Sequence, residues 1–286
     1  MSLKRQSTVR LRWQSQLPLF LIVALGTAGI ALQCIALSST SAPRIVQAFG
    51  LGAFLAVLTW HLRAATGTAA VTGGLCATAL SFATPGWRTS LWPLLALLLL
   101  TLAATRFGRA RKEKLGVAEG RHGRTASQVA ANLGVAVLAS IPLGFSHFFV
   151  VTHILNPDAM QLALVAALAE AAADTLSSEL GEVFGGEPRL LTNLRPVPAG
   201  TDGAVSLAGT LAGCSGAAVV TAVASLALRL TPAEAALVAF AAIAGFLVDS
   251  LLGATFERRG WLNNDAVNFL STLAAAILAA ALSRPS

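Results

Sequence analysis

AVSLAGTLAGCSGAAVVTAVASLAL, residues 204–228, carries no charged side chain and is long enough to cross a bilayer as a single helix. The rest of the chain has the same character: of its 286 residues, 55% are hydrophobic and only 12% are charged, and the mean hydropathy is +0.72. Soluble globular domains carry roughly twice that share of charged residues. The sequence therefore predicts an all-α fold, a polytopic membrane helix bundle.

Hydropathy along the chain predicts about nine transmembrane helices. The predicted spans are 17–37, 45–61, 67–83, 90–106, 128–150, 159–180, 204–228, 233–256 and 265–282. The basic start before the first span could belong to a secretory signal, but the apolar run is too long for one and lacks a clear small-residue cleavage site. We therefore interpret it as a retained first helix.

Basic residues alternate between the two sides of this predicted bundle. Sixteen of the 20 lysines and arginines fall on one side, and the other side holds Arg44, Arg88, Arg229 and Arg284. Because cytoplasmic loops carry excess positive charge, we expect a bacterial-type inner membrane protein with a cytoplasmic N-terminus and an outside C-terminus. This bias also explains the net charge of +7, and no basic stripe interleaved with aromatic residues indicates a nucleic-acid partner.

The composition of the chain shifts once, because every Asp and Glu lies from Glu113 onward, and a basic segment separates the two parts. Residues 1–105 are expected to form N-terminal scaffold transmembrane helices. Residues 106–127 are expected to form a basic cytoplasmic segment that contacts the anionic headgroups of membrane lipids. Residues 128–286 are expected to form the catalytic transmembrane bundle, with a cytoplasmic loop at 182–203.

Ionisable side chains inside predicted spans are the main indication of function, because each costs at least about 2.5 kcal/mol to insert. Asp174 and Asp249 lie about two helical turns from the cytoplasmic ends of their spans, and Asp265 lies at the cytoplasmic start of the last span. Polar residues at the same depth are Arg124, Gln128, Asn132, Ser178, Ser206, Asn264 and Asn268. The sequence therefore predicts one polar site at the cytoplasmic face.

Two interpretations of these polar residues are open. Interhelical hydrogen bonds are common in membrane bundles and account for Gln128 at least as well as a binding role does. Three carboxylates with a single compensating cation, Arg124, are harder to account for in this way. A divalent cation would balance their charge, and Mg²⁺ is commonly held by a few carboxylates together with phosphate oxygens.

The connection GEVFGGEPRLLTNLRPVPAGTDGAVS, residues 181–206, has the composition of a phosphate-binding loop. Its glycines allow backbone amides to face an anion, and Arg189 and Arg195 add forked cationic donors. Gly200 to Gly203 precede a helix N-terminus, which favours anions. The loop lacks the P-loop pattern and by itself could be an ordinary connector. Beside the carboxylates it predicts a phosphoryl- or nucleotidyl-transfer site for a membrane-soluble substrate.

Four stretches carry a family resemblance: GRTASQVAANLGV (123–135), AEAAADTLSSELG (169–181), PRLLTNLRPVPAGTDGAVSLAGTLAG (188–213) and GFLVDSLLGATFERRGWLNNDAVNFLSTL (245–273). They resemble the integral membrane family named domain of unknown function 92, which includes a plant phytyl-phosphate kinase. The family is more distantly similar to dolichol kinase and phosphatidate cytidylyltransferase. The resemblance covers about residues 120–283, whereas residues 1–105 match only as hydrophobic spans.

The resemblance implies a prenyl-phosphate kinase that transfers a phosphoryl group from CTP, or another NTP, to phytyl, farnesyl or geranylgeranyl phosphate. The prenyl tail is expected to lie between helices in the apolar interior. The alternatives are a cytidylyltransferase-like lipid enzyme and a proton- or cation-coupled transporter. Chain length of the lipid, nucleotide preference and oligomeric state stay open.

The resemblance also assigns roles to particular residues. It implies a metal-binding element made of Asp174-Thr175 and Ser178-Glu179, and a nucleotide loop with Arg189, Thr192, Arg195, Gly200, Thr201 and Gly203. On an ideal helix Glu179 lies about 140° around from Asp174, so both can reach one metal ion only if the helix unwinds near Gly181.

The complete site prediction combines the residue pattern with the resemblance. The predicted catalytic residues are Asp174, Arg189, Arg195 and Asp249. The predicted ligands of Mg²⁺ are Asp174, Glu179, Asp249 and Asp265. The predicted nucleotide- and phosphate-binding residues are Arg124, Gln128, Asn132, Ser178, Thr192, Gly200, Thr201, Gly203, Ser206, Asn264 and Asn268.

Overall fold

The computed structural model describes residues 11–37, 42–84, 86–118, 120, 123–145, 156–184 and 186–283. The elements in chain order are α2 (Arg12–Leu21), the π-helical turn η1 (Ile22–Gly26), α3 (Thr27–Leu37), α4 (Ala42–His61), α5 (Gly67–Ala83), α6 (Leu91–Arg106), α7 (Arg109–Leu115), α8 (Ala126–Gly144), α10 (Pro157–Phe184), β1 (Arg189–Leu190), β2 (Ala204–Val205), α11 (Leu207–Leu228), α12 (Pro232–Leu252), η2 (Gly253–Glu257) and α13 (Asn264–Leu282). The two strands have only two residues each and pair with each other, and every other element is helical. The predicted all-α class is therefore confirmed.

Within the described residues, seven helical runs are long and apolar enough to cross a membrane. An eighth is counted if α6 and α7, which are bent by 63° relative to each other, form one span, and α5 is a shorter apolar helix. The predicted count of about nine is therefore approximate. Residues 146–150 of the predicted fifth span, the basic residues before position 11 and Arg284 lie outside the described residues.

The predicted seventh span begins three residues too early. Ala204 and Val205 pair antiparallel with Leu190 and Arg189, so α11 starts only at Leu207. Ser206 caps this helix, because its hydroxyl accepts a hydrogen bond of 3.1 Å from the backbone N–H of Gly209. Hydropathy alone includes the two strand residues because they are apolar and adjoin the helix.

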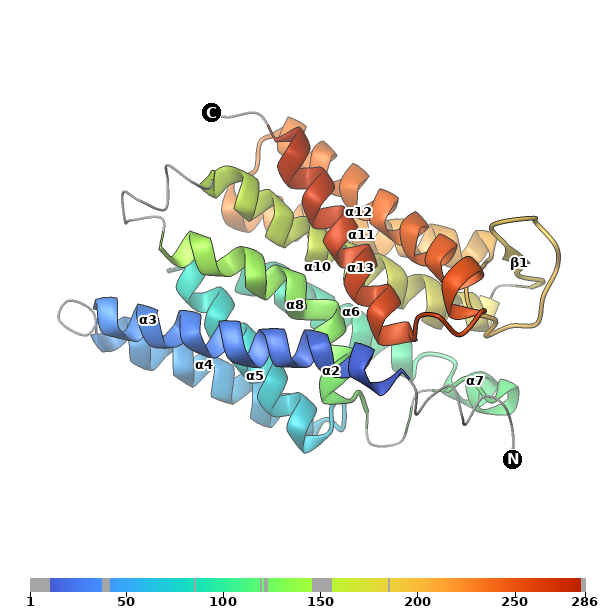
Figure 1. Cartoon of the computed structure of the whole chain (residues 1–286), viewed down its shortest axis with the longest axis horizontal. Coiled ribbons are helices and arrows are strands. Elements are labelled where there is room, and N and C mark those ends of the chain that lie inside the picture. Colours follow the sequence, from blue (N-terminus) through green and yellow to red (C-terminus); the bar gives the residue numbers. More distant parts are fainter. Residues whose placement is uncertain are drawn as a thin grey trace.

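Helix α10 lies at the centre of the bundle. In the most apolar 18-residue stretch of α10, 83% is buried inside the protein, whereas the same share for α4 is 17%. Small residues allow α11 to approach α10 closely: a Cβ atom added to Gly213 would lie 2.8 Å from the backbone oxygen of Ala173. Figure 1 shows α10 between the red and orange C-terminal helices and the green helix α8.

The outer faces of the bundle are apolar. Phe54 on α4 is 61% exposed and Leu226 on α11 is 86% exposed, and many other large hydrophobic side chains are similarly exposed. So many exposed large hydrophobic side chains on a water-soluble protein would promote aggregation, whereas a bilayer solvates them. The surface therefore fits a protein embedded in lipid.

One end of the bundle collects the polar elements. Helices α8, α11 and α13 begin there, and α10 and α12 end there. Figure 1 shows α7 and β1 at this same end, on the right of the view. Side chains cap the three helix starts: Thr125 forms a capping box with Gln128 on α8, Ser206 caps α11, and Asn263 caps α13.

Candidate active site

A polar cavity of about 290 Å³ lies at this end of the bundle. Four helices (α8, α10, α12 and α13), the turn η2 and the connection between α10 and α11 surround it. The predicted site residues that line it are Arg124, Gln128, Asn132, Asp174, Ser178, Glu179, Gly200, Thr201, Gly203, Ser206, Asp249, Asn264 and Asn268. The structure thus brings together residues that are spread over more than 140 positions of the chain. We refer to this space as the polar cavity.

Two carboxylates from different helices line the polar cavity. Asp174 lies on α10 and Asp249 on α12, and they are close enough to interact electrostatically. Glu170, one turn before Asp174, is 1% exposed and interacts with both. Among the described residues, Oδ2 of Asp249 and Oε1 of Glu170 are buried without a hydrogen-bond partner. Because such oxygens are costly, a cation or polar ligand is expected beside this group.

The polar cavity is strongly acidic. Its lining acids are Asp174, Glu179, Glu182, Asp202, Asp249 and Glu257. Arg124 is the one cationic residue among the described residues that line it. A polyphosphate alone would be repelled by this charge, so an anionic ligand would have to enter together with cations.

Arg124 is held in place by the turn between α4 and α5. Its backbone N–H donates to the carbonyl oxygen of Ala64 over 2.9 Å, and its own carbonyl accepts from the N–H of Thr66 over 3.0 Å. Its guanidinium donates to the hydroxyl of Thr175 on α10, at 3.3 Å. Arg124 therefore links the N-terminal helices to the polar cavity at a defined position.

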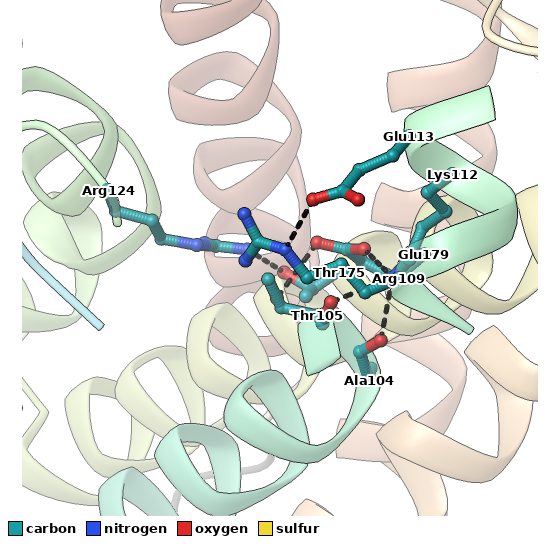
Figure 2. Close-up of polar contacts among 8 residues, drawn as sticks. All are labelled: Ala104, Thr105, Arg109, Lys112, Glu113, Arg124, Thr175 and Glu179. Carbon is teal, nitrogen blue, oxygen red and sulfur yellow. Dashed lines mark hydrogen bonds and ion pairs between the residues drawn. The ribbon is translucent and has the colours of Figure 1, made fainter. Parts of the chain in front are cut away.

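Glu179 is engaged in a buried ion pair. Lys112 on α7 is 1% exposed, and its Nζ lies 2.5 Å from Oε2 of Glu179. The other carboxylate oxygen accepts a hydrogen bond of 2.8 Å from the hydroxyl of Thr105. Lys112 also donates to the carbonyl oxygens of Ala104 and Thr105, over 2.9 Å and 3.0 Å (Figure 2). Both Glu179 oxygens therefore have partners on α6 and α7.

The metal-ligand predictions for Glu179 and Asp265 receive no support from this geometry. Helix α10 continues to Phe184 without unwinding at Gly181, so Glu179 keeps a different direction from Asp174. Asp265 lines a neighbouring recess instead of the polar cavity. Within the described residues, no three His, Cys, Asp or Glu side chains lie together in a way that could hold a metal ion.

The first half of the loop between α10 and α11 forms a small hairpin at the surface. Arg189 pairs with Val205 in the strand register, and its guanidinium donates to the carbonyl oxygen of Leu194 over 2.9 Å. Arg195 and Thr192 are exposed. None of Arg189, Thr192 and Arg195 lines the polar cavity, contrary to the predicted arrangement of the loop.

The second half of the loop lines the polar cavity. The hydroxyl of Thr201 donates to the carbonyl oxygen of Pro198 over 2.7 Å, and the N–H of Ala204 donates to the carbonyl oxygen of Thr201 over 3.0 Å. Gly203 has a φ of +69° and packs against η2, because a Cβ atom there would lie 2.0 Å from the backbone nitrogen of Ala254. This contact fixes the end of the loop against η2, the turn that follows α12.

A family model described as integral membrane protein DUF92 matches residues 50–276. The chain belongs to the DUF92 family of integral membrane proteins. Its predicted membership of that family is therefore confirmed, as is its character as an integral membrane protein. No solved structure matches the chain significantly.

Three proteins are similar in sequence to this DUF92 protein. An uncharacterized membrane protein of Synechocystis is 35% identical over 208 residues, covering 68% of this chain and 73% of that protein. The chloroplastic protein VTE6 of Arabidopsis thaliana is 35% identical over 188 residues, covering 62% of this chain and 53% of VTE6. An uncharacterized membrane protein of Methanocaldococcus jannaschii is 41% identical over 117 residues, covering 40% and 48%. This chain thus spans about half the length of the last two.

Several predicted binding residues of this DUF92 protein have structural partners. Gln128 accepts from the backbone N–H of Thr125 over 2.7 Å as part of the capping box of α8. Asn132 donates to the carbonyl oxygen of Gln128 over 3.0 Å and accepts from the amide of Asn268 over 3.3 Å. The alternative of interhelical hydrogen bonding therefore accounts for part of the polar set, although these residues also line the cavity.

Sequence reasoning missed other lining residues of the polar cavity. Ser177, Glu182, Asp202, Ser250 and Glu257 were not predicted as site residues, whereas Thr175 belongs to the predicted metal-binding element. A signal was present for Asp202, which follows Gly200 and Thr201 directly in the loop. No signal in the sequence pointed to Glu257, because this residue lies beyond the predicted end of its span. It belongs to the π-helical turn η2, which brings it to the cavity.

Proposed function

We propose that this DUF92 protein is a prenyl-phosphate kinase, which transfers the γ-phosphoryl group of CTP, or of another NTP, to an isoprenoid monophosphate. The observation that carries the proposal is the acidic polar cavity, where Asp174 and Asp249 from two membrane helices meet Arg124. The resemblance of four stretches to a family that includes a phytyl-phosphate kinase supports the choice of reaction.

The reaction needs charge neutralisation more than a base. A phosphomonoester has a second pKa near 6, so the acceptor is already a dianion at neutral pH. One of its oxygens forms a bond to the γ-phosphorus of the nucleotide while the bond from that phosphorus to the β,γ-bridging oxygen breaks. The nucleoside diphosphate leaves with that electron pair, and Arg124 stabilises the charge that develops on the transferred group.

The polar cavity fits a divalent cation that enters with the nucleotide. Asp174 and Asp249 would hold Mg²⁺, and phosphate oxygens and water would complete its oxygen ligands. When bound, Mg²⁺ supplies electrostatic stabilisation of the phosphate oxygens. The unpartnered Oδ2 of Asp249 and the excess of acidic over basic lining residues support this assignment.

The site end of the bundle faces the cytoplasm in this proposal. Most of the described basic residues lie at that end, whereas Arg44, Arg88 and Arg229 lie at the opposite helix ends. The positive-inside bias then gives a cytoplasmic N-terminus and an outside C-terminus in a bacterial-type inner membrane. The nucleotide is available on that side.

Purified protein in detergent should convert farnesyl, geranylgeranyl or phytyl monophosphate to the diphosphate when Mg²⁺ and a nucleoside triphosphate are present. Chelation of Mg²⁺ should stop the reaction. A panel of CTP, ATP, GTP and UTP with mass spectrometry of the lipid product measures this. Solute or ion flux across proteoliposomes without any nucleotide, together with no lipid product, would instead favour the transporter.

The loop contact at Gly203 gives a further prediction. Gly203→Ala would push the loop away from Ala254, and misplacement by about 1 Å can cost on the order of 100-fold in rate. We expect kcat/KM for the nucleotide to fall about tenfold or more by the same reasoning. Gly186→Ala is the matched control, since Gly186 has a φ of +59° in the same loop but no atom within 4 Å of an added Cβ. Equal effects of the two substitutions would contradict the role of this contact.

A further inference from the structure

A second cavity, of about 160 Å³, adjoins the polar cavity and is mainly apolar. Helices α4, α5, α6, α8 and α10 surround it. Its apolar walls include Leu55 on α4, Ala69 on α5, Leu94 and Leu97 on α6, and Leu133 on α8. We refer to it as the apolar cavity.

The two cavities share three lining residues, Arg124, Asn132 and Thr175. Arg124 and Thr175 are joined by a hydrogen bond of 3.3 Å, so the shared boundary includes a fixed guanidinium and a hydroxyl (Figure 2). A ligand that occupied both cavities would therefore place the group between its two parts beside Arg124.

The charge of the apolar cavity is opposite to that of the polar cavity. Its lining includes Arg63, Arg106, Arg109 and Arg124, and no acidic residue among the described residues that line it. Arg106 donates to the carbonyl oxygen of Leu62 over 2.8 Å, and Arg109 pairs with Glu113 over 3.0 Å. Arginine side chains with donors left over match the oxygens of a phosphomonoester.

The buried ion pair of Lys112 and Glu179 explains how α7 comes to this position. Lys112 ties α7 to α10 and to the C-terminal carbonyl groups of α6. Arg109 lies on the same short helix and lines the apolar cavity. The bend between α6 and α7 therefore places a cationic residue in the wall of the apolar cavity.

We propose that the apolar cavity binds the isoprenoid tail of a prenyl monophosphate and that Arg124 and the neighbouring arginines hold its phosphate at the boundary with the polar cavity. This inference rests on the proposed kinase function and specifies where its lipid substrate binds. Helices α4, α5 and α6 then bind substrate, so residues 1–105 are more than the scaffold that the sequence predicts.

The test fills the apolar cavity from one side. Gly73 on α5 lines it, and a Cβ atom added there has only Val129 Cγ1, at 3.9 Å, within 4 Å. Gly73→Leu therefore adds an apolar side chain without a backbone clash. The matched control is Gly50→Leu on α4, because Gly50 is exposed, has nothing within 4 Å of an added Cβ and does not line the cavity.

Binding is measured with purified protein in detergent, without nucleotide, using radiolabelled dimethylallyl, farnesyl and geranylgeranyl monophosphate. We expect wild type and Gly50→Leu to bind more tightly as the tail lengthens. Gly73→Leu should lose that dependence and bind geranylgeranyl monophosphate about tenfold or more weakly. Unchanged affinity and unchanged dependence on tail length in Gly73→Leu would overturn the tail site.

A second variant tests the phosphate end. Arg63→Gln should weaken binding of farnesyl monophosphate but not of farnesol, which lacks the phosphate. Equal effects on the two ligands, or none on either, would overturn the arginine assignment.

The outcomes separate this inference from the kinase proposal. If wild type forms diphosphate but Gly73→Leu matches it at every tail length, the tail site is wrong and the kinase stands. If Gly73→Leu weakens the binding of prenyl monophosphates but no nucleotide yields diphosphate, the kinase proposal is wrong and the lipid site stands.

Discussion

Asp174→Asn is expected to lower the rate of prenyl diphosphate formation by roughly 100- to 1,000-fold while the bundle stays folded. Asparagine has almost the same shape, but it removes one of the two negative charges proposed to hold the cation in the polar cavity. Initial rates in detergent at saturating nucleotide measure the loss. Size-exclusion chromatography and thermal unfolding check that the protein remains intact.

The control for this substitution lies on the same helix. Asp158→Asn makes the same chemical change in the first turn of α10, at the opposite end from the polar cavity. Its rate should stay within about twofold of wild type, because a residue outside the site changes at most local helix stability. Full turnover by Asp174→Asn would exclude Asp174 as a ligand of the reacting complex.

Lys112→Met should destabilise the protein by about 3–5 kcal/mol, since it leaves the carboxylate of Glu179 buried without its cation. The double substitution Lys112→Met with Glu179→Gln removes both charges and should recover most of that loss. Unfolding in a detergent mixture, followed by intrinsic fluorescence, measures the free energy of unfolding of wild type, Lys112→Met, Glu179→Gln and the double variant. These four values complete a double-mutant cycle.

The exposed pair on α7 provides the control. Glu113→Gln breaks the ion pair with Arg109, in which the Arg109 side chain is 39% exposed and the Glu113 side chain is 51% exposed. This substitution should lower the free energy of unfolding by less than about 1 kcal/mol. A cost for Lys112→Met no larger than that of Glu113→Gln would contradict a buried ion pair. We expect the double variant also to keep turnover, because the ion pair with Lys112 gives Glu179 a role in positioning α7. Loss of turnover in a well-folded double variant would restore the predicted metal role of Glu179.

Hydropathy and the positions of acidic residues predict the bundle and the end at which polar residues gather. The spans are long apolar runs, and alternation of direction places the starts of α8, α11 and α13 beside the ends of α10 and α12. Asp174 and Asp249 can be found in this way because an intramembrane carboxylate has few structural explanations.

The partner of Glu179 could not be predicted in the same way. Lys112 lies in a basic segment, and the composition of that whole segment is typical of an anchor to anionic lipid headgroups. Only the 63° bend between α6 and α7 turns this one lysine back into the protein. Nothing in the local sequence distinguishes it from Lys114, which is exposed.

The orientation of the loop was also beyond sequence reasoning. Strand pairing of Arg189 with Val205 directs the first half of the loop outward, and a two-residue strand has too weak a pattern to be recognised. The apolar cavity was missed for a related reason: Leu94 and Leu97 have the same hydropathy whether they face lipid or an internal space.

The position of the transferred phosphorus atom tests the central claim most directly. Purified protein is incubated with Mg²⁺, farnesyl monophosphate and CTP labelled either at the γ- or at the α-phosphorus, and the lipid product is isolated. Phosphoryl transfer predicts that the γ label appears in farnesyl diphosphate and that the α label stays in CDP. Appearance of the α label in the lipid, as a cytidylyl transfer would give, or no labelled lipid with any nucleoside triphosphate, would contradict the account.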